Sequence, residues 1–357
     1  MTKAAETVAT GRPLRACRVV LLSAVCCLLP TFVSPPAARA DGAWSRQRSG
    51  TMAWLHGVHF VDERRGWAAG SKGALLATED GGATWQVRRR PTDDNLRDLH
   101  FADADNGWIV CERNVYAIQA TGEAQSYLMK TADGGRTWAR VELPWKGQGA
   151  TLLRVIFAGR ERGWVFGETG VVFATADGGR TWQRQRVPVE RLLLGGTFLD
   201  ERTGWLVGAG ATLLHTQDGG ETWGAGALLT KTTEGATARL YAASFIDARR
   251  GWAVGARGAV YATTNGGRTW NALAEAADAD LYDVKFFDER EGWAAGASGT
   301  LLHTRDGGHT WRAAPEVTTH PLERLFFAGR ARGWAVGFGG TIIAYSRDTN
   351  PPAAAAR

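Results

Sequence analysis

The chain has 357 residues, of which 44% are hydrophobic and 22% are charged, so it can form a sizeable core and is neither a disordered chain nor a coiled coil. Its formal net charge of +6 falls to +2 after residue 40, because residues 1–40 hold five basic residues and one acidic residue. The charge therefore does not indicate nucleic-acid binding. The combination of 46 glycines with 16 tryptophans is unusual, which makes internal repeats the first feature to look for.

Residues 1–40 are typical of an export signal. They combine a basic start, an apolar stretch from Val19 to Leu29, several prolines, and Ala38-Arg39-Ala40 as an A-x-A cleavage site. The apolar stretch is shorter than the roughly 20 residues that a membrane-spanning helix needs. We therefore expect a signal peptide at 1–40, a mature chain that begins at Asp41 and export to a periplasm, with a retained membrane anchor as the alternative.

The cysteines support no disulfide in the mature chain. Cys17, Cys26 and Cys27 lie in the leader, where a lipidated cysteine is a weaker alternative to cleavage, and only Cys111 remains. No base is recognisable beside it in the sequence, so we expect Cys111 to be a packed apolar residue and not a nucleophile.

Seven Gly-Trp pairs divide the rest of the chain into repeats. A phenylalanine lies seven positions before each of these tryptophans. The seven Phe and Trp pairs are Phe60 and Trp67, Phe101 and Trp108, Phe157 and Trp164, Phe198 and Trp205, Phe245 and Trp252, Phe286 and Trp293, and Phe327 and Trp334. Four of the six spacings between units are 41 residues, and residues near 111–127 form an insertion in the second unit.

Six units continue with a run of the form Thr-x-[Asp/Asn]-Gly-Gly-x-Thr-Trp. Its third residue is, in chain order, Asp80, Asp133, Asp177, Asp218, Asn265 and Asp306. The aspartate can accept hydrogen bonds from amides two residues on, and the glycines allow the positive φ of a tight turn. We expect a structural role for this turn; a calcium loop, the alternative, would need more carboxylates at alternate positions.

Each unit carries the local signals of four short strands. In the first unit we expect strands up to Phe60, at Gly-Trp-Ala-Ala-Gly, at Ala74 to Thr78 and from Trp85, with no helical period after residue 40. Four-stranded units repeated about every 41 residues indicate propeller blades. The fold class we expect is all-β, a seven-bladed β-propeller spanning 41–349.

The seventh unit ends without a fourth strand, and the missing strand appears at the other end of the mature chain. Trp44-Ser45-Arg46-Gln47-Arg48 resembles Trp182-Gln183-Arg184-Gln185-Arg186 of the third unit. We expect this N-terminal strand to complete the last blade and remove its free edge. Residues 350–357 are expected to be a disordered tail.

The six runs resemble Asp-box (BNR) repeats, which sialidases, sortilin-type receptors and other propellers share. The fuller pattern Phe-x-Asp-x-x-x-Gly-Trp-x-x-Gly-x-x-Gly, at Phe60 to Gly73 and Phe245 to Gly258, is more specific. Followed by the Asp box, it resembles the photosystem II stability/assembly factor family of seven-bladed propellers over residues 44–349. The resemblance implies a non-enzymatic assembly factor that binds a newly made reaction-centre protein, in the thylakoid lumen if the host is an oxygenic phototroph. It implies a protein partner such as a membrane protein or its exposed tail. From the residues themselves we expect no cofactor, metal or nucleic acid.

That family is also associated with an arginine-rich surface. Three residues before the Gly-Trp tryptophan, four units carry Arg64, Arg202, Arg249 and Arg290. Antiparallel strands place these turns on the same edge as the Asp boxes, so we expect an arginine face suited to carboxylates or an acidic chain terminus. The alternative is a set of solvated turns, in which the arginines pair with neighbouring acidic residues.

A sialidase-like glycoside hydrolase or a sugar-binding propeller is the alternative function. The first strands carry residues that could gather at the channel mouth, namely Arg97, Asp98, Arg154, Tyr241, Tyr282, Asp283, Glu323 and Arg324. No Arg-Ile-Pro segment of the sialidase kind is present, so we expect no enzyme. His59 and His100 occupy the same position in adjacent units, with His56 nearby, and we expect hydrogen-bonded histidines there and no metal site.

Overall fold

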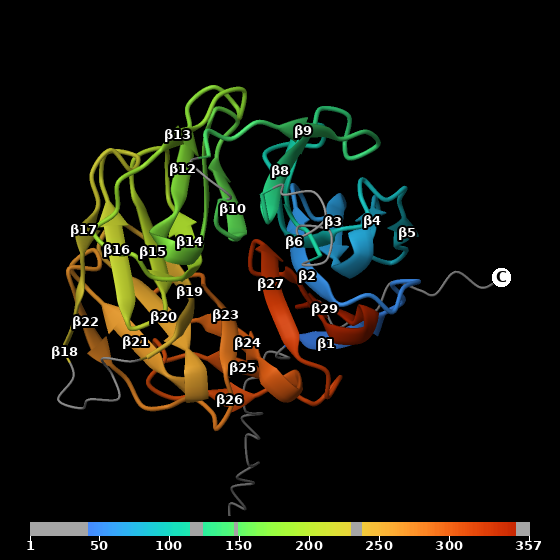
Figure 1. Cartoon of the computed structure of the whole chain (residues 1–357). Helices are drawn as coiled ribbons and strands as arrows, with labels where there is room; N and C mark the ends of the chain where they lie inside the picture. The colour runs from blue at the N-terminus through green and yellow to red at the C-terminus, as the bar shows by residue number, and fades with distance from the viewer. Residues whose placement is uncertain (1–41, 115–123, 146–148, 230–237, 348–357) are drawn as a thin grey trace, which may run out of the picture. The chain divides into compact units, whose positions relative to one another are not determined.

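The computed structural model describes residues 42–114, 124–145, 149–229 and 238–347, which form seven sheets in chain order around a common centre (Figure 1). The innermost strand of each sheet contacts that of the next, and the last contacts the first, so the described chain closes into a ring. This confirms the predicted seven-bladed propeller. The predicted leader at 1–40 and tail at 350–357 lie outside the described residues.

Each blade runs outward from the centre. The innermost strands are β2 (Leu55–Phe60), β6 (Asn95–Phe101), β10 (Leu152–Ala158), β14 (Leu193–Phe198), β19 (Leu240–Phe245), β23 (Leu281–Phe286) and β27 (Leu322–Ala328). The second strands are β3 (Gly66–Gly70), β7 (Gly107–Glu112), β11 (Arg162–Gly167), β15 (Gly204–Gly208), β20 (Gly251–Gly255), β24 (Gly292–Gly296) and β28 (Arg332–Gly337). The third strands are β4 (Leu75–Thr78), β8 (Ser126–Thr131), β12 (Val172–Thr175), β16 (Thr212–Thr216), β21 (Val260–Thr263), β25 (Leu301–Thr304) and β29 (Ile342–Ser346).

The outer strands are short. They are β5 (Gln86–Val87), β9 (Ala139–Val141), β13 (Gln183–Arg184), β17 (Gly224–Ala225), β22 (Thr269–Ala272), β26 (Arg312–Ala313) and β1 (Ala43–Gln47). Among the described residues, five blades have a 3-10 turn between the second and third strands, at η1 (Ser71–Gly73), η2 (Glu168–Gly170), η4 (Ala256–Gly258), η5 (Ala297–Gly299) and η6 (Phe338–Gly340). The fifth blade departs from the prediction, because β18 (Ala227–Leu229) adds a fifth strand that pairs in parallel with β22.

β1 completes the last blade, as predicted. It pairs antiparallel with β29, with Trp44 opposite Tyr345, and the two strands lie side by side at the start and end of the colour range (Figure 1). Trp44 is buried and meets Phe327 edge to face, with ring centroids 5.8 Å apart. The N-terminal strand thus covers the edge of β29 that would otherwise be free.

The constant spacing of Phe and Trp has a packing reason. Phe198 stacks on Trp164 of the preceding blade at 3.5 Å and meets the Asp-box Trp223 of its own blade edge to face at 6.2 Å. The glycine of the Gly-Trp pair lies under the phenylalanine ring, since a Cβ on Gly204 would come within 2.1 Å of Phe198. The aromatic residues therefore join each blade to the next.

The Asp box is a hydrogen-bonded turn. In the third blade, Thr175 Oγ1 donates to Asp177 Oδ1 at 2.8 Å and accepts from the Gly179 amide at 2.9 Å. Asp177 Oδ1 also accepts from the amides of Arg180 and Thr181, and Oδ2 accepts from the Thr181 hydroxyl at 2.6 Å. The prediction that the aspartate accepts from the amide two residues on was wrong. Asp177 accepts from the amides three and four residues on, whereas the Thr175 hydroxyl accepts from the amides of Asp177 and Gly179. These bonds engage both carboxylate oxygens of Asp177, which favours the structural role over a calcium loop.

Replacing Asp177 with alanine is expected to lower the free energy of unfolding by about 1–3 kcal/mol, because the amides of Arg180 and Thr181 and the Thr181 hydroxyl lose their acceptor. Chemical denaturation measures the change. Gln183→Ala, an exposed change in the neighbouring strand β13, is the control and should stay within about 0.5 kcal/mol of the parent. Equal stabilities of the two variants would show that the box is dispensable.

The boxes also predict a pH dependence of stability. Hydrogen bonds from Thr137 to Asp133 and from Thr310 to Asp306 lower the pKa of each carboxyl to about 2. Both values lie below the unfolded pKa of about 3.9, so these groups stabilise the fold above pH 4 and lose that contribution as the pH falls through 2. Thermal unfolding between pH 5 and pH 2 should show a falling midpoint; a constant midpoint over this range would contradict the prediction.

Candidate protein-binding surface

The direction of the inner strands defines two edges of the ring. The inner strands begin at what we call the mouth edge, which also carries the 3-10 turns, as shown by the bond from the Ser71 amide to the Trp54 carbonyl at 2.8 Å. They end at the Asp-box edge, where the Gly81 amide donates to the Arg64 carbonyl at 2.8 Å. Residues at the start and end of an inner strand therefore lie on opposite edges.

The four predicted arginines all lie exposed at the Asp-box edge. In each case the arginine carbonyl accepts from the first glycine of the Asp box in the same blade, through Arg64 with Gly81, Arg202 with Gly219, Arg249 with Gly266 and Arg290 with Gly307. The side chains of Arg202 and Arg249 form no hydrogen bond or salt bridge within the described ranges, although the charge of Arg202 helps to lower the pKa of Asp200. The neighbouring Arg250 pairs with Asp247 at 2.6 Å. The arginine face stays a prediction.

A second set of charges lies on the inner strands. The pairing of every inner strand with its neighbour shifts register after a buried leucine, as between Leu96 and Asp98 in β6. Such a bulge re-aims the residues around it. In four blades the residue after the shift is charged, and we call these residues the mouth cluster: Asp98, Arg154, Asp283 and Arg324.

The mouth cluster joins blades across the channel. Arg324 of the seventh blade lies 3.8 Å from Asp98 of the second and 3.7 Å from Asp283 of the sixth. Asp98 Oδ2 also accepts from the Val155 amide at 3.0 Å, and Asp283 Oδ2 accepts from the Leu325 amide at 2.9 Å. The two carboxylates are thus committed to bonds within the ring.

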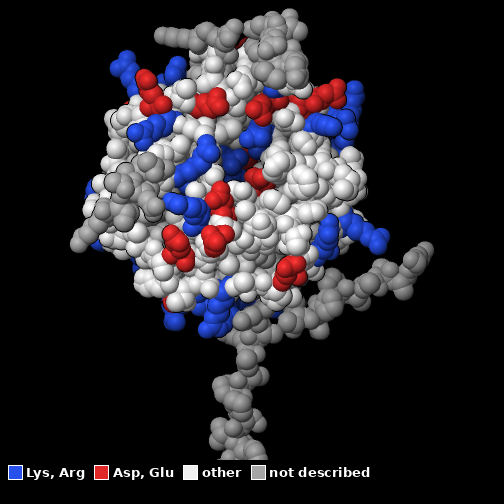
Figure 2. Space-filling model, turned by 60° about the horizontal axis from the view of Figure 1, so that its bottom comes forward, with Lys and Arg blue, Asp and Glu red and all other residues white. Residues whose placement is uncertain are grey.

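The guanidinium groups of the mouth repel one another. Burial, with Arg324 as the second cause, lowers the pKa of Arg154 to about 10, so the group stays charged at neutral pH. Burial, with Arg97 and Arg154 as further causes, lowers the pKa of His56 to about 3 and keeps it neutral. Figure 2 shows a hollow in one face of the ring where Lys and Arg side chains gather beside Asp and Glu side chains. An anion bound at the mouth would relieve this repulsion.

Exposed apolar side chains flank the mouth. Met52 is 82% exposed, Trp54 38% and Phe338 45%. The Trp54 ring lies 5.3 Å from that of Phe338 and 5.5 Å from that of His56. Since Arg97 and Arg154 act on His56, these apolar side chains lie beside the arginines of the mouth. We call Met52, Trp54 and Phe338 the aromatic patch. Exposed aromatic residues and methionine are enriched where proteins bind one another.

The aromatic patch was not predicted from the sequence. Trp54 precedes β2 and Phe338 lies in η6, so the two residues meet only because the ring closes. Trp54 lies outside the Gly-Trp and Asp-box positions, and that departure from the repeat was the signal in the sequence. The mouth residues were found, but as parts of a catalytic alternative.

The residues considered for catalysis or metal binding show other roles. Tyr241 donates to Asp280 at 3.1 Å, and burial and Asp280 raise the pKa of Tyr241 to about 12, the opposite of an activated nucleophile. The rings of His59 and His100 lie 4.2 Å apart, and burial lowers both pKa values. No group of three or more His, Cys, Asp or Glu side chains that could hold a metal occurs in the described ranges.

Two further findings concern Cys111 and the membrane. Cys111 is buried in β7 as a packed residue, as expected, and burial raises the pKa of its thiol to about 12. Within the part of the chain that the structure describes, no helix has the length and apolar character needed to cross a membrane.

A family model described as Photosynthesis system II assembly factor YCF48 matches residues 37–116, 89–187, 180–277 and 273–346. The chain belongs to this family. Its structure is similar to that of YCF48 from Cyanidioschyzon merolae, with a TM-score of 0.69 and 22% identity over 86% of this chain and 100% of that chain. It is also similar to YCF48 bound to a D1 peptide, with a TM-score of 0.68 and 22% identity over 85% of this chain and 96% of that chain.

The same fold occurs in enzymes. A virginiamycin B lyase from Staphylococcus aureus has a TM-score of 0.68 and 10% identity over 86% of this chain and 99% of that chain. At these identities the structural comparisons show the propeller fold alone. No curated protein sequence matches the chain.

Proposed function

We propose that this YCF48-family propeller is an exported, non-enzymatic assembly or stability factor, and that it binds a protein partner at the mouth edge. The observation that carries the proposal is the crowding of Arg97, Arg154 and Arg324 beside the exposed aromatic patch. The family match, and the similar YCF48 structure that is bound to a D1 peptide, support a partner that binds through an exposed peptide segment.

The mouth favours a partner segment that carries a carboxylate. Asp98 and Asp283 each accept a hydrogen bond from a backbone amide and lie near Arg324. Burial and Arg324 lower the pKa of Arg154 although both carboxylates act to raise it, so a further carboxylate beside Arg154 would favour its charged form. Arg97 is one-third exposed, with Glu112 at 3.5 Å as its neighbour. Guanidinium groups bind carboxylates through paired hydrogen bonds, and the aromatic patch offers an apolar surface for adjoining side chains. A chain terminus or an acidic exposed tail of a membrane protein fits this combination.

The partner can be sought in the exported fraction of the host. Tagged parent protein is expected to capture a partner that Arg97→Glu does not retain, because the change reverses one exposed charge at the mouth. If both proteins retain the same partner, the binding site is not at the mouth, and the proposal is contradicted.

The cellular location of the protein is inferred from the leader sequence at residues 1–40. A chain that is exported and cleaved after Ala40 is expected in the periplasm, or in the thylakoid lumen of an oxygenic phototroph, with Asp41 as its first residue. Fractionation of host cells and N-terminal sequencing of the mature protein measure both points, and an uncleaved protein in the cytoplasm would contradict them.

Burial, with Asp280 as a further cause, raises the pKa of both Tyr241 and Tyr282, which supports a non-enzymatic role because an activated tyrosine nucleophile needs a lowered pKa. A sialidase-like activity is the rival. No turnover of a sialoside by the purified protein is expected, and turnover that Tyr282→Phe abolishes would establish the rival.

A further inference from the structure

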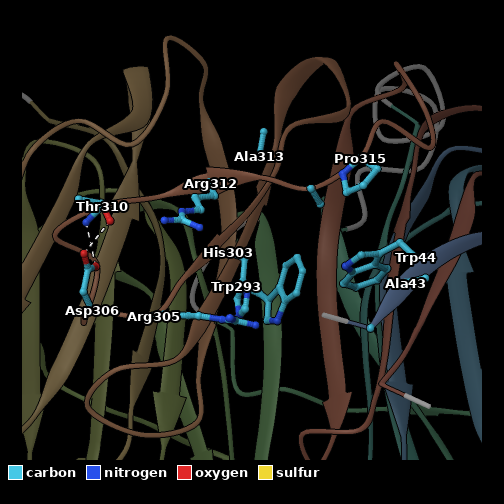
Figure 3. A pocket seen from close by; sticks show the side chains of 12 residues that line it. Ala43, Trp44, Trp293, His303, Arg305, Asp306, Thr310, Arg312, Ala313 and Pro315 are labelled. Atoms are coloured by element: carbon cyan, nitrogen blue, oxygen red, sulfur yellow. Dashed lines mark hydrogen bonds between the residues drawn. The ribbon is translucent and has the colours of Figure 1, made fainter. Parts of the chain in front are cut away.

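A cavity of about 510 Å³ lies between the sixth and seventh blades. Its wall includes Trp44 from β1, Trp293 from β24, His303 from β25 and Arg312 from β26, as Figure 3 shows. The cavity shares no residue with the mouth cluster or the aromatic patch.

The other seams between blades show what normally occupies this position. At five of them the Gly-Trp tryptophan donates its Nε1 proton to the carbonyl of the first Asp-box glycine in the next blade. These pairs are Trp67 with Gly134, Trp164 with Gly219, Trp205 with Gly266, Trp252 with Gly307, and Trp334 with Gly81, at 2.8–3.0 Å. At the sixth, Lys130 donates to the Gly178 carbonyl beside Trp108 instead.

Among the residues that the structure describes, the seam at Trp293 has no such turn. β29 ends at Ser346, and no described residue accepts a hydrogen bond from Trp293 Nε1. Trp293 also fails to stack closely on the next phenylalanine, since its ring lies 6.4 Å from that of Phe327, against 3.5–3.8 Å at the other six seams. It stacks instead on His303 at 4.2 Å. The missing Asp box thus leaves both the cavity and an unused indole donor.

The seam also limits what can fill it. A Cβ on Gly179 would lie 2.5 Å from Trp108 Nε1, and one on Gly267 would lie 2.8 Å from Trp205 Cδ1. Both glycines have positive φ, of 78° and 82°. A turn that enters such a seam therefore needs glycine at this position. The chain's own sequence has Thr349 and Asn350 at the positions of the two glycines, so it departs there from the Asp-Gly-Gly sequence.

The charges around the cavity favour an acidic segment. Arg305 and Arg312 line it, and Arg312 is exposed without a partner in the described part of the chain. The remaining charge, Asp306, accepts hydrogen bonds from the Thr310 hydroxyl and amide, as Figure 3 shows. It also accepts one from the Thr304 hydroxyl. A carboxylate that enters the cavity would meet Arg312 with no competing acid free to pair with it.

We propose that this seam cavity binds an acidic, glycine-containing turn of the Asp-Gly-Gly type from a partner protein. A backbone carbonyl of the turn accepts from Trp293 Nε1, and its carboxylate pairs with Arg312. The partner's turn thus takes the place that the Asp box of the next blade takes elsewhere in the ring. Because this site is separate from the mouth, either can exist without the other.

The test uses a peptide with the sequence of residues 175–181, Thr-Ala-Asp-Gly-Gly-Arg-Thr, added to the ¹⁵N-labelled full-length chain. The indole N–H signals of Trp293 and Trp108 are assigned by Trp293→Phe and Trp108→Phe. Millimolar peptide is expected to move the Trp293 signal in a saturable way and to leave that of Trp108 unchanged. Arg312→Glu should weaken binding about fivefold or more, equivalent to about 1 kcal/mol.

A matched peptide with valine in place of the second glycine is the control and should give no shift, because its Cβ would collide with the indole. No shift of the Trp293 signal with the parent peptide, or equal shifts with both peptides, would overturn the proposal. A shift that appears only after Asp348→Ala in the full-length chain would show that the chain's own C-terminal segment holds the cavity, and would overturn it as well.

Discussion

Replacing Trp44 with alanine is expected to lower the free energy of unfolding by about 3–5 kcal/mol, the range for removing a large buried aromatic side chain. Trp44 contacts Trp293, Phe327 and Tyr345, with ring centroids 5.4–5.8 Å apart. It therefore holds β1 to the sixth and seventh blades. Losing it removes both packing area and the anchor of the strand that closes the ring. Urea denaturation measures the change.

Arg46→Ala is the matched control, because Arg46 lies in the same strand with its side chain exposed. It should change the stability by no more than about 0.5 kcal/mol. Deleting residues 42–49 should cost at least as much as Trp44→Ala, since it also removes the pairing of β1 with β29. Parent-like stability of the deletion variant would show that the ring does not depend on this strand.

Replacing Asp98 with alanine is expected to cost about 3–5 kcal/mol, because it breaks a buried ion pair and leaves its partners uncompensated. Asp98 is 10% exposed, accepts from the Val155 amide and lies 3.8 Å from Arg324. Without it the Val155 amide loses its acceptor and Arg324 keeps only Asp283. The change therefore removes the side-chain hydrogen bond that links the inner strands of the second and third blades.

The control for Asp98 is Asp93→Ala. Asp93 has a 95% exposed side chain, with Arg90 3.8 Å away, so the change should stay within about 0.5 kcal/mol. Thermal and urea unfolding of the two variants measure the difference. If Asp98→Ala matches Asp93→Ala in stability, the mouth cluster does not join the blades.

The sequence predicted the ring because the features that build it recur. The seven-residue spacing from Phe60 to Trp67 repeats in every unit, and six of the seven phenylalanines stack closely on the Gly-Trp tryptophan of the blade before. The seventh unit lacks a fourth strand of its own, and the segment at Trp44 resembles the fourth strand of another unit. The recurring pattern therefore also predicted that β1 completes the last blade. The arginine turns were placed correctly on the Asp-box edge, because antiparallel pairing fixes which turns share an edge.

The candidate sites could not be predicted in the same way, because they arise where the repeat fails. The bulges that place Asp98 and Arg324 in the channel leave no mark in the sequence, and their pairing crosses from the second blade to the seventh. Trp54 and Phe338 meet only after the chain has closed. The seam cavity depends on what is missing beside Trp293, and a missing Asp box could be seen in the sequence but its consequence could not.

We expect the mouth edge, and not the arginine face of the Asp-box edge, to bind the protein partner. The most direct measurement is the affinity of the captured partner for three proteins at low and physiological salt: the parent, Arg97→Glu, and the variant with Arg64, Arg202, Arg249 and Arg290 all changed to Glu. All these side chains are partly or fully exposed, so each protein should fold. We expect Arg97→Glu to weaken binding about tenfold or more at low salt, and the fourfold variant to bind nearly as the parent does. Parent-like affinity of Arg97→Glu, with binding lost in the fourfold variant, would contradict the claim and place the partner on the arginine face.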